Sequence, residues 1–565
     1  MGIAVDLRPP RKYIQFSSKG TPFLHPYRNE FMRDRDNILY LNAFLRLSLK
    51  TQVVTFGKND HTRNRMTHTL EVAQIARTMS RVLGLDEDLT EAIALGHDIG
   101  HTPFGHVGER TLNMLTNNCE TASIGYNIPK NYRGFKHNLN GMRILVETKS
   151  KSFTNFTLFG IVNHSEMTWG ENCKGWDGTD TCPTPTTSRR SCPNHGKTYV
   201  DFYDKYKKFY CVNGTDPAWS FEAYIVRWAD EIAQRHHDIE DAIALNLINI
   251  NELFKRAEPI YMLYNSYETF WRENVPMNDD SNITHKWTML NDSITEYTKQ
   301  KLGKDIVIDR FVSFIVDSYV TYLTAIFTYL IKIFRNEYPF TTKTGIADSA
   351  DFEEVYLQIN PNHIKKIFLQ FIERPWESGS VNYKAPACEA FEDMDVNLKK
   401  ILMSVIINSG DVQRLDGKAG YIIRDIAKAY LTNPQQLPDN PIVEAFRATI
   451  ASITSVQNEN DALRLRKESL TKKAHLSKKE SEEIEDIQHL IIKNDSKIDE
   501  FIEKTGLSTL DVSKIQSFEY RNALTAIRSD ASFIPLLRVN VIRSVCNHIA
   551  NMTDRYALEE HANLY

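Results

Sequence analysis

The sequence predicts a mostly α-helical fold, and three observations support this prediction. Apolar residues recur three and four positions apart over long stretches, such as 34–56 and 64–118, and this spacing places them on one face of a helix. The segment GLDEDLTEA, at 84–92, reads as a turn followed by the start of a new helix. Runs of alternating apolar and polar residues rich in β-branched side chains, which are typical of strands, are scarce.

The size and composition of the chain are those of a globular protein. Its 565 residues allow roughly three or four domains of ordinary size, and the proportions of hydrophobic (42%) and charged (25%) residues are ordinary. A net charge of -4 provides no strong overall attraction to nucleic acid or to an anionic membrane. The first residues, MGIAVDLRPPRKYIQF, lack the apolar run of a signal peptide, so we expect a cytoplasmic protein.

Two stretches depart from the compact helical pattern. Residues 168–218 are rich in Gly, Pro, Thr, Asn and Cys, which predicts a loop-rich insertion. Residues 455–504 carry dense charge of both signs with sparse apolar positions, which predicts a helical hairpin that projects or packs on a neighbouring subunit. A solvated helix pair without a special role is the alternative. The apolar positions are Leu463, Leu470, Ile484, Ile487, Ile491 and Ile498.

The loop-rich insertion contains four of the seven cysteines and one histidine. No two of these cysteines form the C-x-x-C pair that structural zinc sites usually contain. We therefore favour reduced thiols, with a zinc site as the alternative. The residues concerned are Cys173, Cys182, Cys192, His195 and Cys211.

The segment 311–334 is long and apolar enough to be compared with a membrane span. It contains Asp317 in its first third and Lys332 near its end. A central aspartate costs about 2.5 to 3.5 kcal/mol on insertion into a bilayer. We therefore predict a buried core helix.

Histidines and aspartates share the buried faces of the predicted helices. His68 lies four residues before Val72, on a stripe that continues through apolar positions. His97 follows the apolar Ile93 by four residues, and Asp98 is adjacent to it. A buried imidazole is often an ordinary core residue, but a His-Asp pair facing a second buried histidine is costly unless a cation compensates it.

A third predicted helix supplies a candidate fourth ligand. In SFEAYIVRWADEIAQRHHDIEDAIAL, Asp230 follows the apolar Val226 by four residues, and Gln234 and Asp238 follow on that face. Two imidazoles and two carboxylates would leave coordination positions open on a divalent metal, as a hydrolytic site requires.

The ordered set His68, His97-Asp98 and Asp230 resembles the H…HD…D signature of the HD-domain phosphohydrolases. More narrowly, the chain is similar to the bacterial dGTPase-like deoxynucleoside triphosphate triphosphohydrolases, with matching stretches from near its first residue to near its last. These stretches are RDRDNILYLNAFLRLSLKTQV (33–53), RMTHTLEVAQIAR (65–77), HDIGHTPFGHVGE (97–109), WADEIAQRHHDIEDAI (228–243), GKAGYIIRDIAKAYLTNPQQLP (417–438) and MTDRYAL (552–558).

The resemblance implies a domain organisation and partners. We expect an HD-domain helical core over 1–335, containing the loop-rich insertion, and a C-terminal helical region over 336–565 that completes the core and contains the hairpin. Relatives use Mn, Mg or a similar ion, with Fe possible in principle, and they form hexamers or tetramers. Single-stranded DNA or a dNTP is an expected regulator, and no membrane partner is expected.

The resemblance also implies roles for individual residues. His68, His97, Asp98 and Asp230 are the implied metal ligands, and His106 with Glu109 is the implied acid–base pair. Water attacking the α-phosphorus would expel a 5′ alkoxide that needs a proton, which a histidine near neutral pKa can supply. Positions that surround the phosphates in relatives correspond to His101, His137 and Arg65, and positions that bind the sugar 3′ hydroxyl correspond to Gln52 and Asp238.

The sequence also departs from the family pattern. Gln234 stands where many relatives carry a tyrosine beside the sugar, HNLNGM replaces the usual HN-E-Q-S run, and AFLRLSLK lacks the second arginine and the glutamine of AFRRLQ. These changes leave the implied metal ligands untouched but bear on which nucleotide fits.

The expected function is hydrolysis of a deoxynucleoside triphosphate, with dGTP favoured, to deoxynucleoside and inorganic triphosphate. Another HD phosphohydrolase, such as a nucleotidase or a guanosine tetraphosphate hydrolase, is the alternative enzyme. A nucleic-acid-binding scaffold that has lost catalysis is the alternative outside enzymes.

Overall fold

The predicted α-helical fold is confirmed by the computed structural model. The structure describes residues 16–17, 25–51, 64–119, 128–148, 150–164, 200–209, 220–244, 246–275, 281–337, 385–406, 408–472, 477–507, 509–528 and 535–565. Over these ranges the chain forms helices, and β pairing is limited to two isolated bridges, Phe16 with Thr154 and Thr51 with Asn64.

The described residues form two compact units. The first contains Met1–Gly105, Lys136–Trp169 and Tyr203–Ala419, and the second contains His106–Phe135, Gly170–Phe202 and Gly420–Tyr565.

The first unit holds most of the helices. They are α1 (Glu30–Leu39), α2 (Asn42–Leu45), η2 (Arg46–Leu49), α3 (Arg65–Leu83), α4 (Glu87–Gly96), α7 (His137–Glu147), α8 (Asn155–Asn163), α10 (Phe221–Ala244), α11 (Ile250–Ser266), α12 (Glu268–Asn274), α13 (Ser281–Thr298), α14 (Lys304–Glu337) and α17 (Pro386–Ile406).

The remaining helices belong to the second unit or reach into it. They are α5 (Gly105–Thr116), η3 (Lys130–Tyr132), η4 (Asp201–Phe209), α18 (Gly410–Thr432), η5 (Pro434–Gln436), α19 (Asp439–Thr471), α20 (Lys478–Thr505), α21 (Ser517–Arg528), α22 (Pro535–Asn551) and α23 (Asp554–Leu564).

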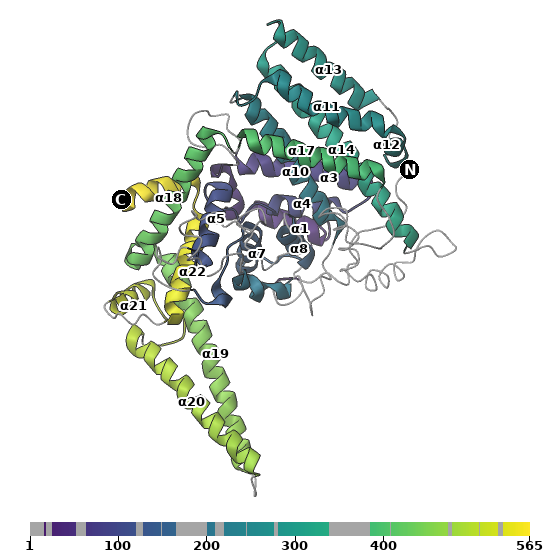
Figure 1. Ribbon diagram of the computed structural model, residues 1–565. Coiled ribbons are helices and arrows are strands. Elements are labelled where there is room, and N and C mark those ends of the chain that lie inside the picture. Colours follow the sequence, from purple (N-terminus) through teal and green to yellow (C-terminus); the bar gives the residue numbers. More distant parts are fainter. Residues whose placement is uncertain are drawn as a thin grey trace. The chain divides into compact units, whose positions relative to one another are not determined.

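The core of the first unit is a bundle in which α4 is surrounded by α1, α3, α8 and α10 (Figure 1). The side chain of Asn64 caps α3, and Gly84 ends it in the left-handed conformation at φ 71°, which glycine adopts without a steric penalty. Asp86 then caps α4 by accepting two backbone N–H groups. These capping contacts set the turn predicted at 84–92. The chain reverses there, so α4 packs against α3.

Two glycines allow α4 and α8 to approach closely. A Cβ atom at Gly96 would lie 2.4 Å from Cδ1 of Ile161, and one at Gly160 would lie 2.3 Å from Cδ1 of Ile93. The apolar side chain of each helix therefore occupies the space opposite a glycine of the other. This packing places the end of α4 deep in the bundle.

The predicted core helix at 311–334 lies within α14. Its apolar window is long enough to cross a membrane, but 67% of that window is buried inside the protein. Asp317 forms an ion pair with Lys286 of α13. The helix is therefore packed as a core helix, as the sequence predicted.

A buried ion pair connects α10 with α14 and α17. Nε and Nη2 of Arg235 donate to the two oxygens of Asp395 at 2.9 and 3.0 Å, and the Tyr319 hydroxyl donates to the same carboxylate at 3.0 Å. Paired donors to one carboxylate give a specific geometry as well as energy. The network therefore fixes the rotation of α10 about its own axis.

The predicted helical hairpin is confirmed as α19 and α20, which run side by side (Figure 1). Leu470, Ile487 and Ile491 form its small apolar core, and Leu463 and Ile484 pack against them. The predicted insertion at 168–218 is described only at 200–209, where η4 forms. The four cysteines and His195 of the zinc alternative lie outside the described residues.

A buried carboxyl group predicts a pH-dependent stability. Glu222 is fully buried and accepts a hydrogen bond from the backbone N–H of Asp86 at 2.9 Å, and burial raises its pKa from 4.5 to about 8. Between these values the folded protein holds a proton that the unfolded chain has released. The free energy of unfolding should therefore fall as pH rises from 4.5 to about 8, by up to about 1.4 kcal/mol per pH unit.

Urea unfolding of parental and Glu222→Gln protein at pH 5, 6, 7 and 8 measures this contribution. Glutamine keeps the shape and the acceptor but cannot ionise, so the Glu222→Gln variant should lose this part of the decline. Glu258→Gln, at an exposed position on α11, is the matched control and should decline like the parent. Equal slopes in all three proteins would contradict the assignment.

Candidate active site

The four predicted metal ligands converge in the first unit from three helices. His68 lies in the first turn of α3, His97 and Asp98 follow the last residue of α4, and Asp230 lies midway along α10. The side chains of His68 and His97 are fully buried, and that of Asp98 is nearly so. The helical faces predicted from the sequence are therefore the faces that meet.

Three of the distances between the donor atoms match those expected around a single ion. Nε2 of His68 lies 3.0 Å from Oδ1 of Asp230. Nε2 of His97 lies 3.3 Å from Oδ1 of Asp98 and 3.9 Å from the same Asp230 oxygen. Ligands about 2.1 Å from an octahedral ion lie about 3.0 Å apart when adjacent and about 4.2 Å apart when opposite, so the observed spacing fits.

The hydrogen bonding of His97 provides an independent test of this fit. Its Nδ1 lies 2.6 Å from the Ala94 carbonyl oxygen, so Nδ1 carries a hydrogen, and in the neutral ring Nε2 carries a lone pair. That buried Nε2 has no hydrogen-bond partner among the described residues, and it faces carboxylate oxygens. A lone pair against carboxylates is unfavourable unless a proton or a metal ion lies between them.

Both carboxylates are ionised, as metal ligands must be. Burial raises the pKa of Asp98, but the adjacent imidazoles of His97 and His101 and the Arg65 guanidinium hold it well below its usual value. Burial also raises the pKa of Asp230, but its contact with His68 and the nearby imidazole of His97 lower it below its usual value. The residues present therefore fit a divalent ion.

Arg65 is fully buried beside this centre. Its Nη1 donates to Oδ2 of Asp98 at 2.7 Å, a contact that the sequence did not predict. Its Nε and Nη2 atoms have no partner within the described ranges. The guanidinium thus orients one carboxylate and retains two donors for another group.

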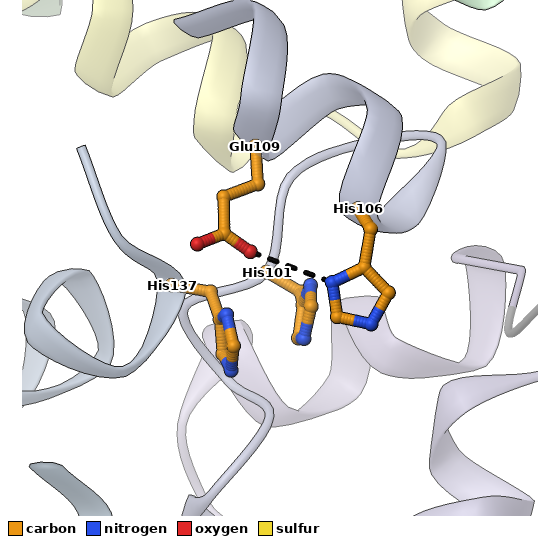
Figure 2. A group of neighbouring side chains, drawn as sticks. All are labelled: His101, His106, Glu109 and His137. Carbon is orange, nitrogen blue, oxygen red and sulfur yellow. Dashed lines mark ion pairs between the residues drawn. The ribbon is translucent and has the colours of Figure 1, made fainter. Parts of the chain in front are cut away.

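Three further histidines extend the centre. His101 donates toward Oδ1 of Asp98, with Nε2 and Oδ1 3.2 Å apart, and its ring stacks on His137 at 3.8 Å between centroids. Figure 2 shows these two rings lying face to face. Nε2 of His137 lies 3.3 Å from Nε2 of His164. Burial lowers the pKa of His101 well below its ordinary value, so the ring is neutral.

The predicted acid–base pair lies at the start of the second unit. His106 Nδ1 and Glu109 Oε2 are 3.6 Å apart on α5, and Figure 2 marks this ion pair. His106 is exposed whereas Glu109 is buried. The preceding residues Phe104 and Gly105 adopt positive φ, 61° and 58°, which is rare for a phenylalanine. The predicted turn between His101 and His106 is therefore tight.

The predicted sugar-binding residues lie in different places. Gln52 falls outside the described residues. Asp238 lies on α10, where burial raises its pKa to about 7 despite the nearby charge of Arg235. Gln234, at the position of the family tyrosine, donates to Oδ1 of Asp230 at 3.1 Å.

Comparisons with known proteins agree with this geometry. The family model of the HD domain matches residues 65–190. A deoxyguanosinetriphosphate triphosphohydrolase-like protein of Rickettsia canadensis (strain McKiel) is 38% identical over 229 residues, and one of Rhodopseudomonas palustris (strain HaA2) is 37% identical over 256 residues. The chain thus contains an HD-domain match and is similar, over part of its length, to dGTP triphosphohydrolase-like proteins.

These similarities cover part of each protein. They include 40% and 43% of this chain, and 51% and 55% of the two relatives. A third relative, of Azoarcus sp. (strain BH72), is 37% identical over 233 residues, which are 40% of this chain and 49% of the relative. The chain thus spans about half the length of the curated relatives it matches.

Some residues of the HD-domain centre were missed by the sequence interpretation. His164 follows the last residue of α8, and His237 lies against His68, with ring centroids 5.2 Å apart. His237 and His236 both contact the carboxylate of Glu71. The available signal was weak, because single histidines near apolar positions are usually ordinary core residues.

Gly100 lies two residues after Asp98, and a substitution there tests how closely this segment approaches α7. A Cβ atom there would lie 2.0 Å from the His137 carbonyl oxygen and 2.2 Å from the Gly141 nitrogen. Backbone atoms cannot move aside like a side chain, so Gly100→Ala should lower the free energy of unfolding by at least about 1–3 kcal/mol and weaken metal binding.

Gly417→Ala is the matched control, because no atom lies within 4 Å of the added Cβ. In the middle of α18, alanine should raise the free energy of unfolding by about 0.5–1 kcal/mol. Thermal or urea unfolding with titration of Mn²⁺ checks both variants. A Gly100→Ala protein that resembles the parent in both measurements would contradict the close approach of α7.

The metal centre itself predicts a stabilisation by divalent ions. Chelator-treated protein should gain about 2.7 kcal/mol of unfolding free energy in Mn²⁺ at one hundred times its Kd. Asp98→Asn retains the side-chain size but removes the charge, and should lose this gain. Asp393→Asn, exposed on α17, should keep it. An unchanged Mn²⁺ effect in Asp98→Asn would exclude this carboxylate as a ligand.

Proposed function

We propose that the protein hydrolyses deoxynucleoside triphosphates, with dGTP favoured, to deoxynucleoside and inorganic triphosphate. The observation that carries this proposal is the set of donor atoms from His68, His97, Asp98 and Asp230, which lie close together and leave the buried Nε2 of His97 facing carboxylate oxygens, where a divalent ion would fit. The names of the relatives supply the reaction and the favoured base.

A divalent ion held by these four residues would supply Lewis-acid polarisation of a phosphoryl oxygen. Arg65 has two buried donors without a partner in the described chain, which suits bidentate contact with phosphate oxygens. We assign His101 and His137 to the phosphates as well, because both rings lie beside Asp98 within the same unit. These cationic and N–H groups would hold the triphosphate while water attacks the α-phosphorus.

The leaving 5′ oxygen needs a proton, which we assign to His106. Glu109 lies 3.6 Å from Nδ1 of His106 and would stabilise its charged form. His106 follows His101 by five residues, so the chain limits the separation of their Cα atoms to at most about 18 Å. The exposure of His106 leaves its ring open to a ligand.

The sugar-binding part of the proposal assigns Gln52 and Asp238 to the 3′ hydroxyl. Gln234 provides a hydrogen-bonding amide where many relatives have a tyrosine, so selection against ribose should be weaker here. The proposal includes Mn or Mg as the ion, with Fe as a third choice of this donor set. It also includes a cytoplasmic homo-oligomer, a hexamer or tetramer, regulated by single-stranded DNA or a dNTP.

The phosphorus product tests the proposed reaction. The protein is incubated with each of the four dNTPs and with GTP, in Mn²⁺ and in Mg²⁺, and phosphorus NMR identifies the products. We expect inorganic triphosphate and deoxynucleoside, fastest with dGTP. Pyrophosphate or single phosphate would instead indicate a nucleotidase-type reaction and contradict the proposal.

Variants connect the product with the assigned residues. His106→Ala should reduce kcat by about 10²–10⁴-fold, the usual contribution of a general acid, with metal binding unchanged. Asp98→Ala should abolish activity, and Asp393→Ala should not affect it. Full activity in Asp98→Ala would exclude the site. Nucleic-acid binding that persists in inactive, metal-free protein would favour the scaffold alternative.

A further inference from the structure

We propose that His164 is a positioning residue that accepts a hydrogen bond from Nε2–H of His137 and thereby fixes the tautomer and orientation of that ring. The inference rests on the proposed function insofar as His137 contacts the substrate phosphates. Nothing in the sequence motifs singled out His164, and its role follows from its hydrogen bonds.

The ring of His164 is held by the end of α8. Its Nδ1 lies 2.7 Å from the Ile161 carbonyl oxygen. A carbonyl oxygen can only accept, so Nδ1 of His164 carries a hydrogen. The residue is almost completely buried, and its ring packs edge-on against His97, with centroids 5.0 Å apart. The imidazole of His164 is thus held on one side by the backbone of α8 and on another by the ring of His97, a candidate metal ligand.

The other ring nitrogen of His164 faces His137. The two Nε2 atoms are 3.3 Å apart, so a single hydrogen must lie between them, because two N–H groups or two lone pairs would repel. Because the hydrogen on Nδ1 of His164 is directed at the Ile161 carbonyl, the neutral His164 ring presents a lone pair at Nε2. This lone pair accepts the hydrogen bond, and His137 is the donor.

The remaining contacts of His137 leave its ring little freedom to turn. It is the first residue of α7, and its ring stacks on His101 at an angle of 17°. With the Nε2 hydrogen directed to His164, any contact between His137 and substrate has to be made through Nδ1. His164 thus decides which nitrogen of His137 faces the phosphates.

A cation shared by the same groups is the competing explanation, because Asp98, His137 and His164 can each place a ligand atom within 4.8 Å of the others. We favour the hydrogen bond because Oδ1 of Asp98 already faces Nε2 of His97 within the four-residue ligand set, while Oδ2 accepts from Arg65 at 2.7 Å.

Nitrogen-15 NMR of histidine-labelled protein, loaded with diamagnetic Mg²⁺, observes the tautomers directly. Each signal is assigned by comparison with a variant in which one histidine is replaced, because the signal of that histidine then disappears from the spectrum. In the unsubstituted protein we expect hydrogen on Nε2 of His137 and on Nδ1 of His164. Hydrogen on Nε2 of His164 would overturn the proposal, and this measurement needs no variant of His164 and no substrate.

Two substitutions of His164 then separate hydrogen bonding from packing. In His164→Gln, the amide oxygen can reach the place of Nε2, so His137 should keep its hydrogen on Nε2. In His164→Leu no acceptor remains, and His137 should become a mixture of tautomers. His285→Gln, at an exposed position on α13, is the control and should change neither signal. An unchanged His137 signal in His164→Leu would contradict the proposal.

Kinetics and metal content complete the test. His164→Leu should lose about 10–100-fold in kcat, as is usual when the partner of a functional imidazole is removed, and His164→Gln should recover most of this loss. Both should bind one ion per chain. Two ions in the parent and one in His164→Leu would favour the shared cation. A tautomer change without any triphosphate production would leave this inference standing and exclude only the proposed reaction.

Discussion

The lone pair at Nε2 of His97 is the constraint on which the rest of the centre depends. The Ala94 carbonyl holds a hydrogen on Nδ1, and the carboxylates of Asp98 and Asp230 face Nε2, which carries a lone pair in the neutral ring. A divalent ion among these atoms would satisfy the nitrogen and both carboxylates together. The packing of α3, α4 and α10 therefore creates a centre that suits a metal ion.

The surrounding structure serves to keep these groups close. Gly96 and Gly160 allow α8 to pack closely against α4. This contact places the ring of His164 beside that of His97. The ion pair of Arg235 with Asp395 holds α10 against α17. The candidate metal ligands are therefore held by contacts between helices, and the positions of their side chains follow from packing rather than from local loop geometry.

The sequence predicted the helices, their buried faces and the convergence of His68, His97, Asp98 and Asp230, because all three depend on local periodicity. His68 and Asp230 each lie four residues from an apolar position, which is enough to determine the direction in which a helical side chain points. The contact between Arg65 and Asp98 could not be predicted in this way, since it depends on how two helices cross. The position of His164 beside His97 and His137 could not be predicted for the same reason. The roles of His106 and Glu109 came from family resemblance, and the structure adds that the two side chains lie in contact.

The hairpin of α19 and α20 contains a feature with a different consequence. Asn460 is completely buried and accepts a hydrogen bond from the side chain of Asn494 at 2.9 Å, and it donates to Asp495 at 2.9 Å. Buried amides of this kind specify register at some cost in stability. Because the two helices are aligned by this polar contact, a sliding of one helix past the other would leave amides unsatisfied. Removal of this contact would therefore free the two helices to shift along one another without breaking any apolar contact of comparable specificity.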